Sequence, residues 1–494
     1  MKLAEAINVT PSPRQLAWQQ LGFYGFIHFG MNTMTDREWG DGTEDPALFA
    51  PTGLDEAAAD RAVAAMQAAH MRGLILTCKH HDGFCLWPTK TTTHSVAASP
   101  WQNGHGDVVR LFADACARHQ MQFGVYLSPW DRNAAVYGQG KAYDDLYVAQ
   151  LTELLSNYGP LFEIWLDGAN GEGPNGKHQV YDWDRYYQVM RTLQPNAVIA
   201  VSGPDVRWIG NEAGHIRPSE WSVVPAALRE AERVAALSQQ SDDAAFSRQF
   251  KSTDDDLGSR DALADYDGPL VWYPAEVDTS IRPGWFFHEA QDTQVRSGEA
   301  LFDLYCKAVG GNAALLLNVP LDRCGRFGAA DQAALVAVGQ KIIQLTDTDV
   351  SGAAVVAATS AVAPFAITGG ASEAPAATMG DAGETLALQS AWEAAPDDAT
   401  PTVTLTWAQP VCVNTLILRE AISRGQRVEA FSVMALQADG WHALTRATTI
   451  GNCRILRFEE VETTALKITF TGFRAAPTLA EVRVARLEGV EARV

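Results

Sequence analysis

The chain has 494 residues, of which 47% are hydrophobic, so it is long enough to form two domains with sizeable cores. It carries 59 acidic and 38 basic residues, which gives a formal net charge of −21, and no Lys/Arg-rich block interrupts the acidic background. This balance argues against nucleic acid and against an anionic membrane surface as partners, and it favours a neutral partner.

The N-terminal stretch, residues 1–18, has no apolar core of signal-peptide length, and no run approaches the length of a membrane span. The sequence as written therefore predicts a soluble cytoplasmic protein without membrane insertion; a signal peptide removed from a longer chain would instead imply a periplasmic or secreted protein. The cysteines form no CxxC pair, so neither a disulfide framework nor a thiolate zinc site is indicated, and we expect buried thiols.

Short apolar runs alternate with longer amphipathic runs along the first two thirds of the chain. The strand-like runs lie at 23–30, 72–81, 122–131, 161–168, 196–203, 268–278 and 313–322, and the helix-like runs at 54–70, 107–120, 144–159, 183–195 and 298–310. Repeated βα units with nearly continuous apolar strands predict a parallel sheet buried on both faces. Roughly eight such units, with no glycine-rich phosphate fingerprint after any strand, favour an α/β fold of the (β/α)8 barrel type over residues 1–345.

After residue 345 the character of the sequence changes. Residues 350–378 are rich in Ala, Thr, Ser and Gly, and they give way to short runs of alternating apolar and polar residues, such as TVTLTWAQPVCVNTLILRE, without an amphipathic helix between them. This pattern predicts a linker and a C-terminal antiparallel β-sandwich over residues 346–494. The pattern is similar to that of discoidin-like sugar-binding modules, and a purely structural role for the domain is an equal alternative.

The active site of a (β/α)8 barrel lies at the carboxyl ends of the strands. We therefore expect the polar residues that end each apolar run to lie close to one another there. These residues are His28, His80, His81, Asp82, Tyr126 to Asp131, and Asp167. The histidines suggest a metal, but His28 is not in an HxH motif, and the adjacent His80 and His81 point to opposite faces of a strand unless a bulge or the strand end turns them. We therefore expect direct hydrogen bonding of a hydroxyl-rich substrate, without a metal or cofactor.

Cleavage of a glycosidic bond requires two carboxylates on opposite sides of a sugar. Asp167 is the first candidate, because it follows an apolar strand and precedes the sequence GANGEG, which lets the backbone open around a substrate. Its alternative role is to cap a turn or the next helix. The region 204–220 offers Glu212, in a glycine-flanked loop, and Glu220, at an apparent strand start, and we favour Glu212.

Several motifs stand in order at the strand ends. They are FIHFG (26–30), REWG (37–40), LTCKHHDGFCLW (76–87), YLSPWDR (126–132), EIWLDGANG (163–171) and RWIGNEAG (207–214). Together they resemble the retaining α-L-fucosidases of glycoside hydrolase family 29, and the resemblance covers the whole barrel. It implies that the aspartate of the WxDG motif, Asp167, is the nucleophile, and that substrate is bound by His28, Glu38, Trp39, His80, His81 and Tyr126. A late-loop tryptophan is expected to face the methyl group of the sugar, and Trp285 is the candidate.

The sequence GNE followed by SEWSVVP is similar to the α-1,3/1,4-restricted branch of that family. The resemblance implies that Glu212 is the acid/base, with Glu220 and Glu276 in reserve, and that the substrate is a fucosylated, Lewis-type glycan. The long irregular region 204–267 carries Trp221 and an acidic run at 254–256. It is expected to build a subsite for galactose, with a solvated surface flap as the alternative. Two alternatives are a catalytically inactive, lectin-like protein and a retaining glycosidase for another sugar.

Overall fold

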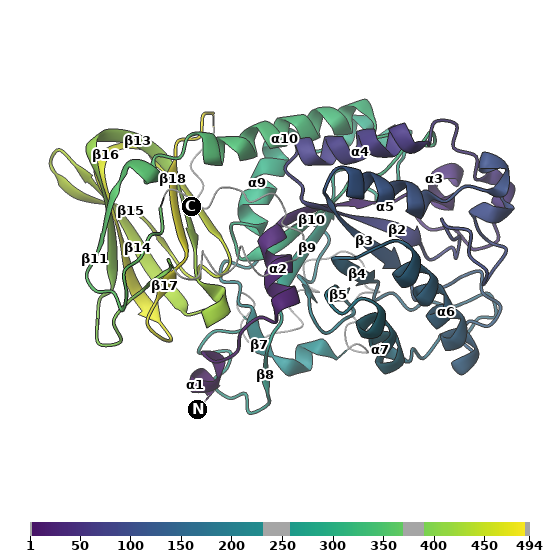
Figure 1. Ribbon diagram of the computed structural model, residues 1–494, viewed down its shortest axis with the longest axis horizontal. Coiled ribbons are helices and arrows are strands. Elements are labelled where there is room, and N and C mark those ends of the chain that lie inside the picture. Colours follow the sequence, from purple (N-terminus) through teal and green to yellow (C-terminus); the bar gives the residue numbers. More distant parts are fainter. Residues whose placement is uncertain (1, 231–256, 369–389, 490–494) are drawn as a thin grey trace.

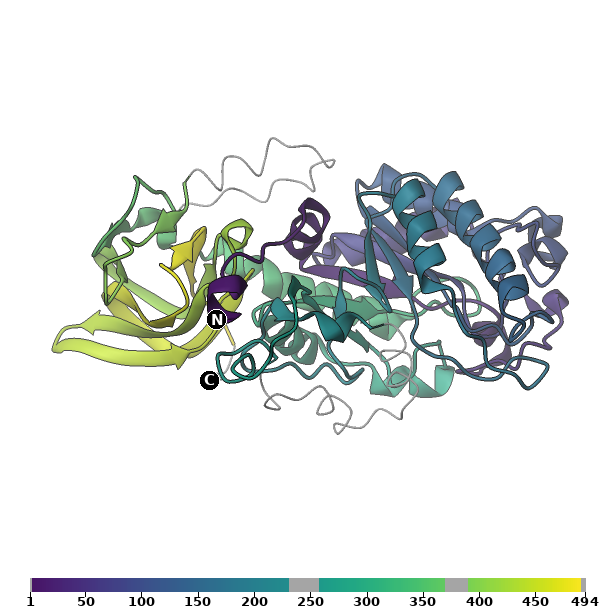
Figure 2. The ribbon, with the colours of Figure 1, turned by 90° about the horizontal axis from the view of Figure 1, so that it is seen from below.

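The computed structural model describes residues 2–230, 257–368 and 390–489. A barrel occupies one end of the molecule and antiparallel sheets occupy the other, in both views (Figures 1 and 2). The barrel sheet has eight parallel strands in the order β5-β4-β3-β2-β1-β10-β9-β6. They are β1 (Phe23–Ile27), β2 (Gly73–Lys79), β3 (Gln122–Leu127), β4 (Glu163–Leu166), β5 (Val198–Val201), β6 (Arg207–Trp208), β9 (Ala275–Ser280) and β10 (Ala313–Asn318). An antiparallel bridge between Ser202 and Arg207 nearly closes the sheet, which confirms the predicted barrel.

Helices cover the outer face of the barrel. They are α4 (Glu56–Ala68), α5 (Val108–Arg118), α6 (Lys141–Asn157), α7 (Trp183–Leu193), α9 (Gly298–Ala308) and α10 (Ala329–Asp347), and shorter helices lie at α1 (Lys2–Ala6), α2 (Pro13–Leu21) and α3 (Met31–Thr35). Side-chain caps start four of the outer helices, because Asp55, Asp107, Asp182 and Ser297 each accept a bond from a backbone N–H of the first turn.

The regular alternation of strand and helix is interrupted between β5 and β9. Within the described residues, β6 follows β5 without an intervening helix. The run at 268–278, which we expected to form one strand, is divided into β8 (Leu270–Trp272), which pairs antiparallel with β7 (Val223–Pro225), and the barrel strand β9. Pro274 stands at the division, where a residue without a backbone N–H cannot continue the ladder.

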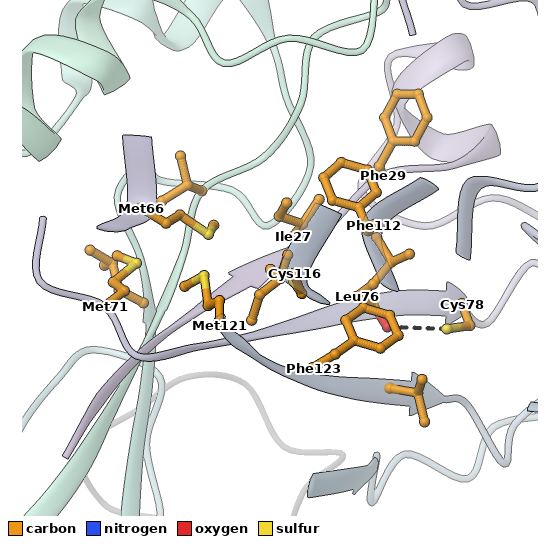
Figure 3. Close-up of a cluster of buried hydrophobic side chains, with 14 of the residues drawn as sticks. Ile27, Phe29, Met66, Met71, Leu76, Cys78, Phe112, Cys116, Met121 and Phe123 are labelled. Atoms are coloured by element: carbon orange, nitrogen blue, oxygen red, sulfur yellow. Dashed lines mark hydrogen bonds between the residues drawn. The ribbon is translucent and has the colours of Figure 1, made fainter. Parts of the chain in front are cut away.

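Alternation along the strands separates two clusters of buried side chains. On β1, Tyr24 and Phe26 belong to a cluster inside the barrel, whereas Phe23 and Ile27 belong to the cluster between the barrel and its helices. The outer cluster joins side chains of neighbouring strands to those of α4 and α5 (Figure 3): Ile27, Leu76, Phe123, Met66, Phe112 and Cys116. The same alternation turns Trp165 of β4 into the barrel and Ile164 outward.

The C-terminal part is antiparallel, as expected. Its main sheet has the order β11-β13-β16-β14-β15, with β18 pairing β13. The strands are β11 (Val355–Ala358), β13 (Thr402–Arg419), β14 (Val428–Gln437), β15 (Gly440–Ala447), β16 (Arg454–Phe473) and β18 (Glu481–Ala485), and β12 (Trp392–Glu393) pairs with β17 (Thr478–Leu479). Register shifts along β13 and β16 bend these long strands, so that β11 pairs with the first part of β13 and β18 with the last.

All seven cysteines are free thiols. Five are buried, but Cys324 is half-buried and Cys412 is exposed, so the expectation of buried thiols is wrong for these two. Cys412 lies on β13 at a position whose side chain faces solvent. Among the described residues, no helix combines the length and the hydropathy needed to cross a membrane.

Candidate active site

Asp167 follows β4 directly, with a side chain that is 22% exposed. Its Oδ2 accepts a hydrogen bond of 3.0 Å from the Tyr126 hydroxyl and lies 3.7 Å from Nε2 of His81. Its Oδ1 accepts a bond of 2.8 Å from the backbone N–H of Ala169. One carboxylate oxygen therefore caps the turn after the strand, and the other faces the side chains at the strand ends.

The glycines after Asp167 allow the loop to pack closely against aromatic side chains. A Cβ atom on Gly171 would lie 2.1 Å from the Trp130 ring, and one on Gly173 would lie 2.5 Å from Tyr137. The Trp130 indole N–H also donates a bond of 3.0 Å to the carbonyl of Glu172. These side chains pack against the backbone of the loop, and its opening around a substrate stays a prediction.

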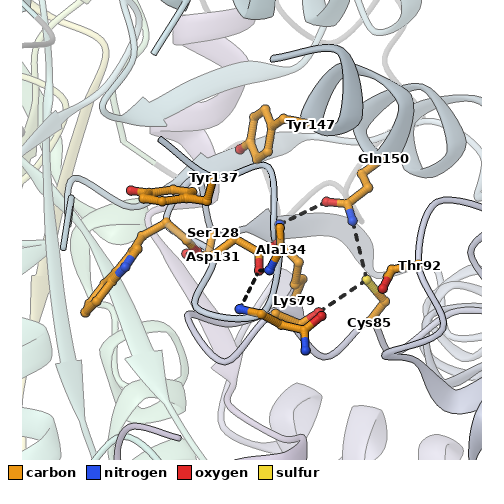
Figure 4. A network of polar contacts seen from close by, with 12 residues as sticks. Lys79, Cys85, Thr92, Ser128, Asp131, Ala134, Tyr137, Tyr147 and Gln150 are labelled. Atoms are coloured by element: carbon orange, nitrogen blue, oxygen red, sulfur yellow. Dashed lines mark hydrogen bonds and ion pairs between the residues drawn. The ribbon is translucent and has the colours of Figure 1, made fainter. Parts of the chain in front are cut away.

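His80 and His81 lie on the same side of the barrel, although they are adjacent in the sequence. The register between β2 and β3 shifts between Thr77 and Lys79, β2 ends at Lys79, and the two imidazole centroids are 4.1 Å apart. The bulge and the strand end thus turn both rings to the same side, with His80 stacked on Tyr126 and His81 beside Asp167. Lys79 is buried elsewhere, with its ammonium 2.9 Å from Asp131 and 2.9 Å from Gln150 (Figure 4). This network anchors the segment that carries both histidines.

The hydrogen-bond partners of His28 and His81 assign the tautomer of each ring. Oδ1 of Asn318 accepts the backbone N–H of His28 at 3.2 Å and lies 2.9 Å from Nδ1 of the same residue, so Nδ1 carries the proton. Nδ1 of His81 lies 2.7 Å from the Ser128 hydroxyl, which in turn donates to the carbonyl of Trp130. This ring is therefore also protonated on Nδ1, and both rings keep Nε2 as an acceptor.

His80 has the opposite tautomer. Its Nδ1 lies 3.4 Å from Nδ2 of Asn32, whose Oδ1 accepts the backbone N–H of Gly40 at 2.8 Å, so the amide donates to His80 and the proton is on Nε2. Burial lowers the pKa of His28 to about 3 and lowers the pKa of His80 and of His81 below the ordinary value. Three neutral imidazoles therefore offer one donor and two acceptors, which suits hydroxyl groups.

Glu38 holds the late loop that carries Trp285. Its carboxylate accepts the backbone N–H groups of Trp285, at 2.9 Å, and Phe286, at 3.2 Å, and lies 2.7 Å from Nε2 of His288. The Trp285 ring is 5.1 Å from the His28 ring, and its indole N–H donates a bond of 3.0 Å to Oε2 of Glu212. Glu38 thus positions Trp285 by accepting its backbone N–H. A direct contact of Glu38 with a sugar stays a prediction.

Glu212 lies in a turn that its neighbours close. Oδ1 of Asn211 accepts the backbone N–H groups of Ala213, at 3.1 Å, and His215, at 3.0 Å, and Nδ2 of Asn211 donates to the carbonyl of His215 at 3.0 Å. Gly214 has a φ of 85°, and a Cβ atom there would lie 2.7 Å from Leu304. The turn that presents the Glu212 carboxylate is therefore defined by an asparagine and a glycine.

Glu220 and Glu276, the alternative candidates for the acid/base, are buried and bonded to other side chains of the protein. Glu220 is 1% exposed and forms ion pairs with the guanidinium groups of Arg207 and Arg217. Glu276 is fully buried inside the barrel, where it accepts hydrogen bonds from the Tyr24 hydroxyl and from the Trp165 indole N–H. These contacts favour Glu212 among the three glutamates.

Trp39 is the most exposed aromatic residue of the predicted set, at 55%. Its ring centroid is 5.7 Å from that of His81 and 5.7 Å from that of Trp130, with an edge-to-face orientation in both cases. Trp39 therefore lies beside the residues around Asp167 and leaves much of its indole surface open to solvent.

Sequence reasoning missed Phe286 and Asp278. Phe286 is fully buried, and its ring lies 5.3 Å from His28 and 5.0 Å from His80. Asp278 of β9 accepts a bond of 2.6 Å from the Trp208 indole N–H, and burial, together with the negative charge of Glu212, raises its pKa well above the ordinary value. Polar residues at every second position of β9 could have indicated that Asp278 faces the barrel interior.

Trp221, which the region 204–267 carries, is buried, and whether other residues of the region form a sugar subsite stays a prediction. It is 2% exposed, and the guanidinium of Arg474 lies 3.5 Å from its ring centroid. The ring packs toward the C-terminal domain, where cation–π contact and apolar burial stabilise it. The acidic run at 254–256 lies outside the described residues.

A chain of contacts joins the two candidate carboxylates. Asp167 accepts from Tyr126, the Tyr126 ring is 6.2 Å from the His28 ring, the His28 ring is 5.1 Å from Trp285, and Trp285 donates to Glu212. These side chains form one continuous wall at the carboxyl ends of the strands. In the part of the chain that the structure describes, no three His, Cys, Asp or Glu side chains group as a metal site would require.

A family model for alpha-L-fucosidase matches residues 47–343. The chain is 35% identical over 478 residues to alpha-L-fucosidase 1 of Arabidopsis thaliana, covering 95% of this chain and 86% of the plant protein. It is 41% identical to a Bacteroides ovatus protein of known crystal structure, with a TM-score of 0.81 and coverage of 100% of this chain and 77% of that one. A Ruminococcus gnavus fucosidase of glycoside hydrolase family 29, solved in complex with fucose, is 27% identical with a TM-score of 0.79, covering 98% of this chain and 96% of that one.

The family model covers most of the barrel, and the plant relative is similar over nearly the whole chain. The strand ends of the barrel carry the carboxylates, histidines and tryptophans described above. The chain therefore belongs to the alpha-L-fucosidase family of glycoside hydrolases.

Proposed function

We propose that the protein is an exo-acting, retaining α-L-fucosidase that removes terminal α-1,3/1,4-linked L-fucose from branched, Lewis-type glycans by double displacement. Asp167 is the nucleophile and Glu212 the acid/base. The observation that carries the proposal is the continuous wall from Asp167 through Tyr126, His28 and Trp285 to Glu212, because it provides two carboxylates and a hydroxyl-binding surface in one site.

In the first displacement, Oδ2 of Asp167 attacks the anomeric carbon and the bond from that carbon to the glycosidic oxygen breaks. Glu212 gives its proton to the departing oxygen, so that the leaving sugar departs as an alcohol and the fucosyl group becomes an ester of Asp167. The Tyr126 hydroxyl, 3.0 Å from Oδ2, orients the attacking oxygen. The neutral imidazoles of His28, His80 and His81 accept from and donate to the sugar hydroxyls.

In the second displacement, the Glu212 carboxylate takes a proton from water while the water oxygen attacks the anomeric carbon and the ester bond to Asp167 breaks. Two inversions at the same carbon retain its configuration, and both carboxylates return to their starting states. A separation of about 5 to 5.5 Å between the two carboxyl groups is expected for this mechanism.

The preference for α-1,3/1,4 linkages is supported by the sequence around Glu212, GNE followed by SEWSVVP. The exposed indole of Trp39 beside the site supports a further contact with the sugar on the leaving side. Binding energy gained from a branching sugar would lower the barrier at the fucosidic bond, so truncated substrates should lose kcat as well as affinity.

The test is product release from a substrate panel. Lewis a and Lewis x trisaccharides should be hydrolysed at least about a hundredfold more efficiently than an α-1,2-fucosyl disaccharide, a difference of roughly 2.7 kcal/mol in transition-state binding. Equal kcat/KM on both linkages would contradict the linkage preference. Release from aryl glycosides of another sugar would contradict the specificity for fucose, and binding without any release would identify a lectin.

A further inference from the structure

We infer that the C-terminal domain positions the acid/base of the barrel, with Gln426 and Thr448 as positioning residues for the loop 209–222 that carries Glu212. The inference rests on the proposed role of Glu212 and adds a second-domain contribution to the same site. It is carried by hydrogen bonds that run from side chains of the C-terminal domain to backbone groups of this loop.

Gln426 pairs with the backbone of the loop at its end. Its Oε1 accepts the backbone N–H of Ser222 at 2.8 Å, and its Nε2 donates to the carbonyl of Glu220 at 3.0 Å. The side chain is 1% exposed. Because buried backbone groups need partners, this amide replaces the bonds that a neighbouring strand would provide, and its removal leaves a loop donor unsatisfied.

A second contact point lies two residues earlier in the loop. The carbonyl of Pro218 accepts hydrogen bonds from the Thr448 hydroxyl, at 3.1 Å, and from the Arg454 guanidinium, at 3.0 Å. Proline lacks a backbone N–H, so the carbonyl is the backbone hydrogen-bonding group that this residue offers. The C-terminal domain thus contacts the loop at Pro218 as well as at its end.

Contacts within the loop connect these points to Glu212. Nη1 of Arg217 donates to the carbonyl of Ile209 at 3.3 Å and lies 3.3 Å from a carboxylate oxygen of Glu220, so the start and the end of the loop are joined. The turn closed by Asn211 then presents Glu212. A shift of the end of the loop, where Gln426 binds it, should therefore also move the Glu212 carboxylate.

Catalysis depends on this position because a displacement of about 1 Å from a productive geometry can cost on the order of a hundredfold in rate. The short barrel strand β6, Arg207–Trp208, provides little support of its own on this side. If the contacts only joined two domains, their loss would lower stability without changing how the enzyme discriminates among leaving groups. The leaving-group dependence therefore distinguishes positioning from structural support.

The experiment compares Gln426→Ala, Thr448→Val and Asn452→Ala in the full-length protein. Asn452 is the matched control, because its side-chain amide joins the same two parts of the molecule through a bond of 2.8 Å to the carbonyl of Gln19. For each variant, kcat/KM is measured on a Lewis-type trisaccharide and on a dinitrophenyl fucoside, whose leaving group needs no protonation, and the melting temperature is recorded.

We expect Gln426→Ala to lose about tenfold or more in kcat/KM on the trisaccharide and less than about twofold on the dinitrophenyl fucoside. Thr448→Val keeps the shape of the side chain and should show a selective loss of about twofold to fivefold. The Thr448→Val variant tests the inference even if the Gln426→Ala variant does not fold. Asn452→Ala should change both substrates equally, whatever its melting temperature.

An unchanged ratio between the two substrates in both Gln426→Ala and Thr448→Val would overturn the inference, and so would the same selective loss in Asn452→Ala. Glu212→Ala is measured in parallel. If Glu212→Ala shows the selective loss and the two loop variants do not, the positioning role alone is wrong. If Glu212→Ala shows no selective loss, the assignment of Glu212 itself is wrong.

Discussion

The two loops that carry the candidate carboxylates are built in different ways. Asp167 extends directly from β4, and its partners Tyr126 and His81 come from β3 and from the end of β2, which are the next strands of the same sheet. Glu212 lies beyond the two-residue strand β6, in a turn closed by its own neighbours, and the later part of the same loop is hydrogen-bonded to the C-terminal domain.

The two carboxylates should therefore differ in how far substitutions around them change their positions. A carboxylate fixed by a buried strand moves only if the barrel moves, because strand position is held by the sheet and by packing on both faces. An acid/base on a long loop depends on a few specific hydrogen bonds from distant parts of the chain. Substitutions in the two regions should therefore reduce activity with a different dependence on the substrate.

The largest expected effect is at the strand-borne carboxylate. Asp167→Ala or Asp167→Gly should lose on the order of 10³-fold or more in kcat on every substrate, because no ester intermediate can form. Added azide should restore turnover of an activated fucoside and give a fucosyl azide of inverted configuration, as checked by NMR. Activity near that of the wild type would refute the assignment.

At the loop-borne carboxylate the loss should depend on the leaving group. Glu212→Ala should reduce kcat/KM on a Lewis-type trisaccharide by about 10²-fold or more, and by less than about tenfold on a dinitrophenyl fucoside, because only the natural leaving group needs a proton. The ratio of the two values is the measurement. An equal loss on both substrates would assign the proton transfer to another residue.

An aromatic side chain donates a hydrogen bond to each of the two carboxylates, which allows a matched comparison. Tyr126→Phe removes the hydroxyl that donates to Asp167 and should cost roughly tenfold or more on all fucosides, because hydrogen bonds to charged groups are strong. Trp285→Phe keeps an aromatic ring beside His28 but removes the donor to Glu212, so its loss should be larger on the trisaccharide. The same dependence on leaving group in both variants would contradict the distinction between the two sides.

The strand that delivers Asp167 also buries a second carboxyl group, Glu163, whose Oε2 accepts a bond of 2.8 Å from the Trp18 indole N–H. Burial, together with the charge of Glu276, raises the pKa of Glu163 well above its ordinary value. The folded chain therefore keeps a proton that the unfolded chain releases above the ordinary glutamate pKa near 4.3. The free energy of unfolding should then fall as the pH rises above that value, by up to about 1.4 kcal/mol per pH unit for each retained proton.

Glu163→Gln is neutral at every pH and should weaken this decline, as measured by urea unfolding between about pH 5 and pH 8. Glu459→Gln, at an exposed position of the C-terminal domain, is the control and should leave the pH dependence unchanged. An equal pH dependence in Glu163→Gln and the wild type would show that the barrel pair does not retain the proton.

The smallest expected effect is that of metal removal. Neither carboxylate needs a metal in the proposed mechanism, because Tyr126 and Trp285 orient them and neutral histidines bind hydroxyls. Prolonged treatment with a chelator should leave kcat/KM unchanged, and elemental analysis of the protein should find no stoichiometric zinc. Loss of activity that a divalent ion restores would revive the metal hypothesis raised by His28, His80 and His81.

The barrel, the antiparallel C-terminal domain and the position of Asp167 at a strand end could be predicted from the amino-acid sequence alone. These features depend on local patterns: apolar runs of strand length, amphipathic helices with capping residues, and alternation along each strand. Alternation also places Glu163, Trp165 and Asp167 on one face of β4 and its extension, which is a consequence of the strand period alone.

The surroundings of Glu212 depend on contacts between residues far apart in the sequence, which the folded chain brings together. No local pattern shows that Glu220 is neutralised by Arg207 and Arg217, that Trp221 packs under Arg474, or that Gln426 bonds to a loop more than two hundred positions earlier. Each of these contacts joins residues that are brought together by the fold, and hydrogen bonds and ion pairs of this kind depend on distance and direction in space, not on spacing along the chain.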